Sequence, residues 1–243
     1  GVVGLFLSLF FTSVFSEFLG EMVGDRLAAY EGNYFAFVVM GIGVYSFLQS
    51  TLYELSRRIR QAQVVGTLEA LLGTRTPLSA TILCMPLYPL LGTSFNVLGI
   101  LVLGSLFFGL ELDFAGLPAA GVVLLITSAA FAGLGLCAAG LTVAFKRAEA
   151  APAFLANLSL FLGGVWYPVE ALPPWLQKAA QLLPLTHALE AMRKAMLAGA
   201  SVREVLPSLV ALSAISALLV PIGMIAFRWS VRRAMRDGTL TQY

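Results

Sequence analysis

YPVEALPPWLQKAAQLLPLTHALEAMRKAML, residues 167 to 197, separates the last two long apolar runs of the chain. Pro173 and Pro174 open a first helix here, because proline suits the start of a helix. Pro184 ends that helix, and an amphipathic helix restarts after it. Helical pieces broken by proline at membrane depth indicate a re-entrant hairpin that protein shields from lipid. The residues expected to shape this outer hairpin are Pro168, Pro173, Pro174, Trp175, Leu176 and Pro184.

The composition of the whole chain is that of a membrane protein. Of its 243 residues, 59% are hydrophobic and only 12% are charged, with a mean hydropathy of +0.88. A soluble domain carries about 25% charged residues. Apolar runs long enough to cross a bilayer, about 20 residues, occur at six places. We therefore expect an all-α membrane protein with six transmembrane helices in one domain over residues 1–243. The expected spans are about 1–18, 35–55, 78–110, 117–145, 152–167 and 205–227.

The first and third apolar runs need separate interpretation. The chain begins Gly-Val-Val, and its first run has neither a basic flank nor a small-residue cleavage site. We interpret it as a true span whose N-terminal flank is missing, rather than as a signal peptide. The third run is too long for one straight span, and Pro86 and Pro89 are expected to break or kink it. Cys84 and Cys137 lie inside apolar runs and are expected to be buried thiols.

Lysine and arginine are unequally divided between the two sides of the predicted bundle. One set of loops and the C-terminal tail carry Arg57, Arg58, Arg60, Arg75, Lys146, Arg147, Arg228, Arg232, Arg233 and Arg236. The other side carries Arg26, Lys178, Arg193, Lys194 and Arg203. Loops rich in these residues stay in the cytoplasm. Both termini are therefore expected to be cytoplasmic.

A water-compatible helix follows the second span, in VVGTLEALLGTRTP at residues 64 to 77. Gly66 can break the incoming helix, and Thr67 can cap the next one. Three leucines recur at helical spacing, and Glu69 lies in the first turn, where the helix dipole favours an acid. A short surface helix with an apolar stripe suits docking into a partner's groove, although packing on its own bundle stays open. The docking residues are Gly66, Thr67, Leu68, Glu69, Leu71 and Leu72.

Together, these two stretches resemble the ABC-2 type exporter permeases. The family's first cytoplasmic loop has a pattern like E-x-x-x-G-T-L-E-x-L-L-x-T-P, which stands here as VVGTLEALLGTRTP with extra residues before the proline. Its outer segment is similar to P-x-x-x-L-P-x-W-L-x-x-x-x-x-x-x-P-L-T-x-x-x-x-x-x-R, which stands here as PVEALPPWLQKAAQLLPLTHALEAMR. The resemblance covers essentially the whole chain, except that the family's N-terminal amphipathic elbow helix is expected to be missing.

The resemblance implies a transport subunit rather than an enzyme. Two such permeases pair in the bacterial inner membrane, as a homodimer or heterodimer, and two cytoplasmic ABC ATPase subunits bind them. The helix at residues 64–72 would be the coupling helix, seated in a cleft of an ATPase subunit. No GxxxxGK[ST] loop occurs in this chain. ATP and Mg are therefore expected on the partner ATPase, with no cofactor, metal or nucleic acid on this chain. The cargo would be an amphipathic compound, lipid or glycoconjugate moved outward.

Aromatic and amide side chains inside the spans are candidates for the substrate path. Amides inside a bilayer often bond neighbouring helices, and aromatic rings often face lipid, so substrate contact and packing both stay open. These candidates are Phe11, Phe15, Asn96, Asn157, Phe161 and Trp166. His187, the single histidine, is expected to be structural or interfacial, because no HExxH, CxxC or GxSxG motif accompanies it.

Two other classes of membrane protein are weighed against the exporter. An ion-coupled secondary transporter usually needs ionisable residues at mid-membrane depth, and the sequence places none at the centres of the expected spans. A polytopic membrane enzyme needs acids or histidines clustered near one face, whereas Glu111, Asp113 and Glu170 are scattered. An adjacent ATPase gene would favour the exporter.

Overall fold

The computed structural model describes residues 9–14, 34–64, 87–145 and 150–236, and all regular structure in these ranges is helical. The main helices are α2 (Tyr34–Val64), α5 (Leu87–Phe108), α6 (Leu117–Phe145), α7 (Ala150–Leu162), α8 (Pro174–Ala180), α9 (Pro184–Leu197) and α10 (Leu206–Arg236). Two 3-10 turns, η3 (Phe114–Gly116) and η4 (Val169–Ala171), lie in the connections, and residues 9–14 are helical. The prediction of an all-α protein is confirmed for this part of the chain.

Four helices are long and apolar enough to cross a membrane. They are Tyr34–Gln61, Leu91–Phe108, Phe114–Val143 and Leu206–Arg233, and α7 is a shorter apolar helix. Most of the first expected span and the beginning of the third lie outside the described residues. The count of six spans therefore stays a prediction.

The ends of two helices differ from the expected spans. The helix α2 continues past residue 55 to Val64, and Glu54 forms ion pairs with the arginines of the next turn. The helix α7 stops at Leu162 because Gly164 takes a positive φ of 80°, a conformation that ends helices and that glycine adopts without strain. Within the described residues α5 runs from Leu87 to Phe108 and includes Pro89, and the expected break at Pro86 lies outside the described residues.

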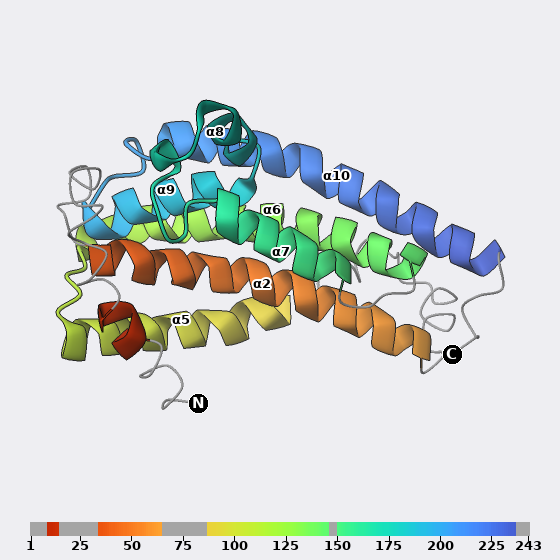
Figure 1. The fold of residues 1–243 in the computed structure, drawn as a ribbon, viewed down its shortest axis with the longest axis horizontal. Coiled ribbons are helices and arrows are strands. Elements are labelled where there is room, and N and C mark those ends of the chain that lie inside the picture. Colours follow the sequence, from red (N-terminus) through yellow and green to blue (C-terminus); the bar gives the residue numbers. More distant parts are fainter. Residues whose placement is uncertain (1–8, 15–33, 65–86, 146–149, 237–243) are drawn as a thin grey trace.

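The helix α6 is the centre of the bundle and contacts α10, α2, α9 and α7 (Figure 1). Its contact with α10 is close enough for backbone to meet backbone. A Cβ added at Gly223 of α10 would lie 2.4 Å from the carbonyl oxygen of Gly133 in α6. A Cβ at Gly140 would lie 3.3 Å from the backbone of Ala226 and Phe227. Small residues thus allow the two helices to approach as transmembrane helices commonly do.

The helices also differ in how far they are covered. The apolar window of α2 is 78% buried inside the protein, whereas the windows of α5 and α10 are 17% and 22% buried. Apolar side chains therefore cover the outside of α5 and α10, as lipid-facing helices require. Within the described part of the chain, α5 packs mainly on α2.

The two ends of the bundle are chemically distinct. We call one the hairpin end, because α8, α9, η3 and the beginning of α2 lie there (Figure 1). The backbone N–H of Asp113 donates to the carbonyl oxygen of Met196 at 2.9 Å and fixes the end of α9 to the α5–α6 connection. We call the other the basic end, where α2 and α10 finish. Its described arginines are Arg57, Arg58, Arg60, Arg228, Arg232, Arg233 and Arg236.

Candidate functional site

The predicted docking helix cannot be placed. Its residues Gly66, Thr67, Leu68, Glu69, Leu71 and Leu72 lie outside the described residues. The structure does place its attachment point, because α2 ends at Val64 on the basic end of the bundle (Figure 1). The role of this helix therefore stays a prediction.

The prolines of the predicted outer hairpin lie at the starts of its helices, while its re-entrant form and its outer location stay predictions. Pro168 precedes η4, Pro173 is the N-cap of α8 and Pro174 is its first residue. Pro184 is the first residue of α9, so it opens the second helix after α8 has ended at Ala180. Trp175 is exposed and Leu176 is half-buried. Fixed φ and the absence of an N–H suit proline to these first positions.

Hydrogen bonds from side chains to the backbone hold the two hairpin helices together. The Oγ1 of Thr186 donates to the carbonyl oxygen of Ala180 at 2.7 Å. The Nε2 of His187 lies 2.8 Å from the carbonyl oxygen of Gln181, which agrees with a structural role for this histidine. The amide of Gln177 donates to the carbonyl oxygen of Leu172 at 2.8 Å. Each bond satisfies a carbonyl at a helix end or turn.

Tyr167 fixes the turn between α7 and the hairpin. Its hydroxyl donates to the carbonyl oxygen of Phe161 in the last turn of α7. This bond ties the start of the connection to the end of α7.

Arg193, the last residue of the hairpin motif, is buried in the bundle with only 4% of its surface exposed. Its Nε and Nη2 donate to the carbonyl oxygen of Phe37 in α2 at 3.2 and 3.0 Å. Its Nη1 and Nη2 donate to the carbonyl oxygens of Gly164 and Val165 at 3.0 and 3.2 Å. The guanidinium carbon also lies 3.3 Å from the centre of the Phe37 ring, a favourable cation–π geometry. One side chain of α9 thus joins α2 to the turn after α7.

Gly41 provides the space for this arrangement. A Cβ at that position would lie 2.5 Å from the carbonyl oxygen of Val165 and 2.8 Å from Nη2 of Arg193. The hydroxyl of Tyr34 adds a second contact from α2, donating to the carbonyl oxygen of Trp166 at 2.8 Å. The start of α2 and the hairpin therefore form one hydrogen-bonded unit.

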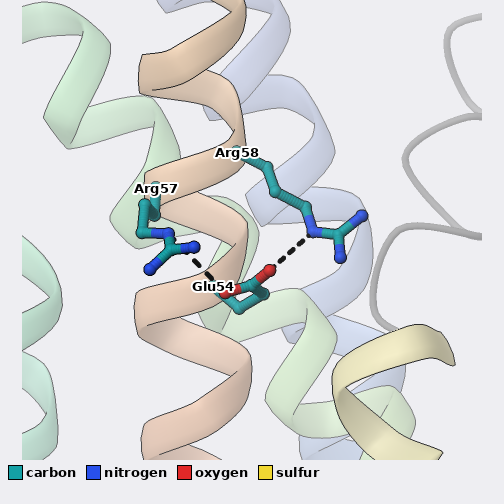
Figure 2. Close-up of polar contacts among 3 residues, drawn as sticks. All are labelled: Glu54, Arg57 and Arg58. Atoms are coloured by element: carbon teal, nitrogen blue, oxygen red, sulfur yellow. Dashed lines mark hydrogen bonds and ion pairs between the residues drawn. The ribbon is translucent and has the colours of Figure 1, made fainter.

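A polar groove of about 790 Å³ opens between α2 and α5 toward the basic end. Figure 2 shows its charged part, in which the Glu54 carboxylate lies between two arginines. The Nε of Arg58 is 2.8 Å from Oε1 of Glu54, and the Nε of Arg57 is 3.9 Å from Oε2. The lining residues are Ser50, Glu54, Arg57, Arg58, Gln61, Leu91, Gly92, Thr93 and Asn96.

The residues predicted for the substrate path do not form one cluster. Asn96 lines the groove between α2 and α5. Asn157 and Phe161 lie exposed on α7, one turn apart, and Trp166 is exposed after that helix. Phe11 is exposed in the short helix of residues 9–14, and Phe15 lies outside the described residues. The substrate path therefore stays a prediction.

Sequence reasoning treated Arg193 as a loop charge and did not single out Glu54. One signal for Arg193 was available, because Leu185, Leu189 and Arg193 recur every four residues and share the buried face of α9. The spacing of Glu54, Arg57 and Arg58 likewise predicts i,i+3 and i,i+4 pairs. Among the described residues, no group of three His, Cys, Asp or Glu side chains is arranged to hold a metal ion.

Comparison with known proteins assigns this bundle to a family. The family model described as ABC-2 type transporter matches residues 2–197. Nodulation protein J of Neorhizobium galegae is 36% identical over 75 residues, which are 31% of this chain and 29% of that protein. The alignable stretch thus spans less than a third of that relative. Because the family match covers most of the chain and four described helices can cross a membrane, the chain is a membrane-spanning permease subunit of the ABC-2 type transporter family.

Proposed function

We propose that this chain is the permease subunit of an ABC exporter that moves an amphipathic compound, lipid or glycoconjugate outward. The family match over residues 2–197 carries the proposal. The energy would come from ATP and Mg on separate ATPase subunits, two of which would bind a pair of permeases. The pair could be a homodimer or a heterodimer, in the bacterial inner membrane.

The distribution of charge supports an orientation for the proposed exporter. The basic end, where α2 and α10 finish (Figure 1), holds seven described arginines. The described basic residues toward the hairpin end are Lys178, Arg193, Lys194 and Arg203, and Arg193 is buried against carbonyl oxygens. The positive-inside rule then places the basic end in the cytoplasm and the hairpin outside. Both chain termini would be cytoplasmic.

This orientation brings the predicted docking helix to the ATPase subunits. Residues 64–77 begin where α2 ends, at the basic end. The stripe of Leu68, Leu71 and Leu72 would fill an apolar cleft in the ATPase, and ATP-driven closure of the ATPase pair would move this helix. That movement would reshape the path between the two permeases.

Co-purification with the ATPase subunit tests this function. Leu68→Asp combined with Leu72→Asp puts two charges into the proposed interface, and we expect the tagged permease to lose the ATPase. Leu182→Asp combined with Val202→Asp makes the same kind of change toward the hairpin end, at positions that are exposed. That control is expected to retain the ATPase. Full retention by the Leu68 and Leu72 variant would contradict docking through this helix.

The class of substrate is tested separately. The purified permease–ATPase complex is reconstituted, and ATP hydrolysis is measured with added amphiphiles, lipids and free sugars. Apolar faces on α5 and α10 and the exposed pair Asn157 and Phe161 on α7 favour an amphipathic cargo. We expect stimulation by amphipathic compounds and not by free sugars.

A further inference from the structure

We propose that the groove between α2 and α5 binds the headgroup of an anionic phospholipid, whose acyl chains lie along the outer face of α5. The lining residues of this site belong to α2 and α5, and none of them belongs to the hairpin. Three properties of the groove favour this ligand. They are its polar side chains, its net charge, and its continuity with a row of exposed apolar side chains on α5, which we call the apolar track.

The groove has the size and lining of a small-molecule site. Its volume of about 790 Å³ lies within the range of about 300–1,000 Å³ that ligand pockets occupy. The polar groups come from two helices. Ser50 and Gln61 of α2 face the groove together with Thr93 and Asn96 of α5. Hydroxyl and amide side chains of this kind donate hydrogen bonds to phosphate and glycerol oxygens.

The charge of the groove favours an anion. Two guanidinium groups and one carboxylate line it, which leaves one net positive charge. The Nε of Arg58 donates to Glu54 at 2.8 Å, and the Nε of the more exposed Arg57 lies 3.9 Å from the same carboxylate (Figure 2). Guanidinium groups bind phosphate through pairs of N–H groups. The carboxylate therefore orients Arg58, and one net positive charge remains in the groove for an anion.

The apolar track identifies the ligand as a lipid rather than a soluble phosphate compound. Leu91, Phe95, Leu98 and Val102 recur at helical spacing on α5, and all four are more than half exposed. Leu91 also lines the groove and begins the part of α5 that can cross a membrane. A phosphate held in the groove therefore lies at the level of the membrane interface, with acyl chains continuing along the track.

Lipid binding to the purified full chain tests the proposal. The delipidated protein is titrated in detergent with dioleoyl-phosphatidylglycerol, dioleoyl-phosphatidylcholine or glycerol phosphate, and bound ligand is counted by native mass spectrometry. Arg57→Gln with Arg58→Gln removes two positive charges from the groove. Arg228→Gln with Arg232→Gln removes two from exposed positions on α10 at the same end. Phe95→Asn shortens the apolar track and leaves the charged groups in place.

The expected pattern separates a specific lipid site from its alternatives. The wild-type chain should bind phosphatidylglycerol about tenfold more tightly than phosphatidylcholine, and the groove variant should lose about tenfold. The α10 variant should change less than twofold. Phe95→Asn should weaken the binding of phosphatidylglycerol, whose acyl chains contact the track, and leave the binding of glycerol phosphate unchanged. Equal losses of affinity in the two arginine variants would mean that general surface charge attracts the lipid. That result would contradict a specific site in the groove. If glycerol phosphate bound as tightly as phosphatidylglycerol, the acyl chains would not contribute and the ligand would not be a lipid. If phosphatidylcholine bound as tightly, the site would not select a negative charge. If the groove variant does not fold, Phe95→Asn and Asn96→Leu test the site instead. Each should bind phosphatidylglycerol more weakly than the wild type, and unchanged binding in both would contradict the proposal.

Discussion

Gly41 and Arg193 meet where α2 passes the turn that follows α7. We predict that Gly41→Ala destabilises the protein, because the new methyl group would lie 2.5 Å from the carbonyl oxygen of Val165 and 2.8 Å from Nη2 of Arg193. Overpacking of this kind costs about 1–3 kcal/mol, which corresponds to a fall in Tm of about 3–10 °C for a chain of this size. Thermal unfolding in detergent measures the effect.

Gly43→Ala is the matched control for that substitution. It changes the same residue type in the same helix, and its nearest contact would be Cγ1 of Val97 at an ordinary 3.4 Å. Alanine also favours a helix over glycine by about 1 kcal/mol, so the Tm should stay unchanged or rise slightly. A similar fall in both variants would show that the Arg193 contacts are not the cause.

Sequence reasoning could place the prolines of the hairpin but not the partners of its arginine. Proline acts through its own φ and its missing N–H, so Pro174 and Pro184 mark the starts of helices by themselves. Arg193 instead binds carbonyl oxygens of Phe37, Gly164 and Val165. Every residue carries a backbone carbonyl, so residue type does not identify these partners. The sequence indicated only that Arg193 faces the core, because it follows Leu185 and Leu189 at intervals of four residues.

The close packing of α6 against α10 can be tested by a substitution at their contact. We predict that Gly223→Ala separates the two helices, because its Cβ would lie 2.4 Å from the carbonyl oxygen of Gly133 and 2.9 Å from Cβ of Leu136. Backbone atoms cannot rotate away as a side chain can. We therefore expect a lower Tm and a smaller folded fraction in size-exclusion chromatography.

The control for the α6–α10 contact is Gly121→Ala. Gly121 also lies in α6, but a Cβ there would meet nothing within 4 Å. We expect this variant to be at least as stable as the wild type, since alanine stabilises exposed helix positions. Loss of stability at Gly121 and not at Gly223 would contradict the close contact.

The lengths of the elements were harder to predict than their existence. Apolar runs predicted α2, α6 and α10 because burial in lipid or protein needs a continuous apolar surface. Hydropathy does not report where a helix continues into water, so it does not predict the extension of α2 through Arg57 and Arg58, where both residues pair with Glu54. The groove between α2 and α5 joins residues about 40 positions apart, which no local pattern links.

At the scale of the whole molecule, the orientation in the membrane can be tested with single cysteines. In a chain with Cys84 and Cys137 replaced by alanine, Ser201→Cys marks the exposed loop after α9 and Arg232→Cys marks the exposed end of α10. We predict that an impermeant maleimide added to intact cells labels the first and not the second, because arginine-rich ends stay cytoplasmic.

Permeabilised cells give the control for that experiment. Both variants should then react, which shows that each cysteine is accessible when the reagent can reach it. Labelling of Arg232→Cys in intact cells would place the basic end outside. It would also move the proposed docking helix away from the ATP-hydrolysing subunits.

The backbone contact between α6 and α10 has a mechanical consequence. Two helices whose main chains touch at Gly133 and Gly223 have little freedom to slide, because no flexible side chains separate them. We expect the pair to move as a single stiff body during a transport cycle. The helix α5 is held mainly through α2 and is largely uncovered, so displacement should concentrate at the α2–α5 seam. A force applied to the chain between α2 and α5 would therefore displace α5 more easily than any other described helix. The α6–α10 pair would stay fixed while α5 moves.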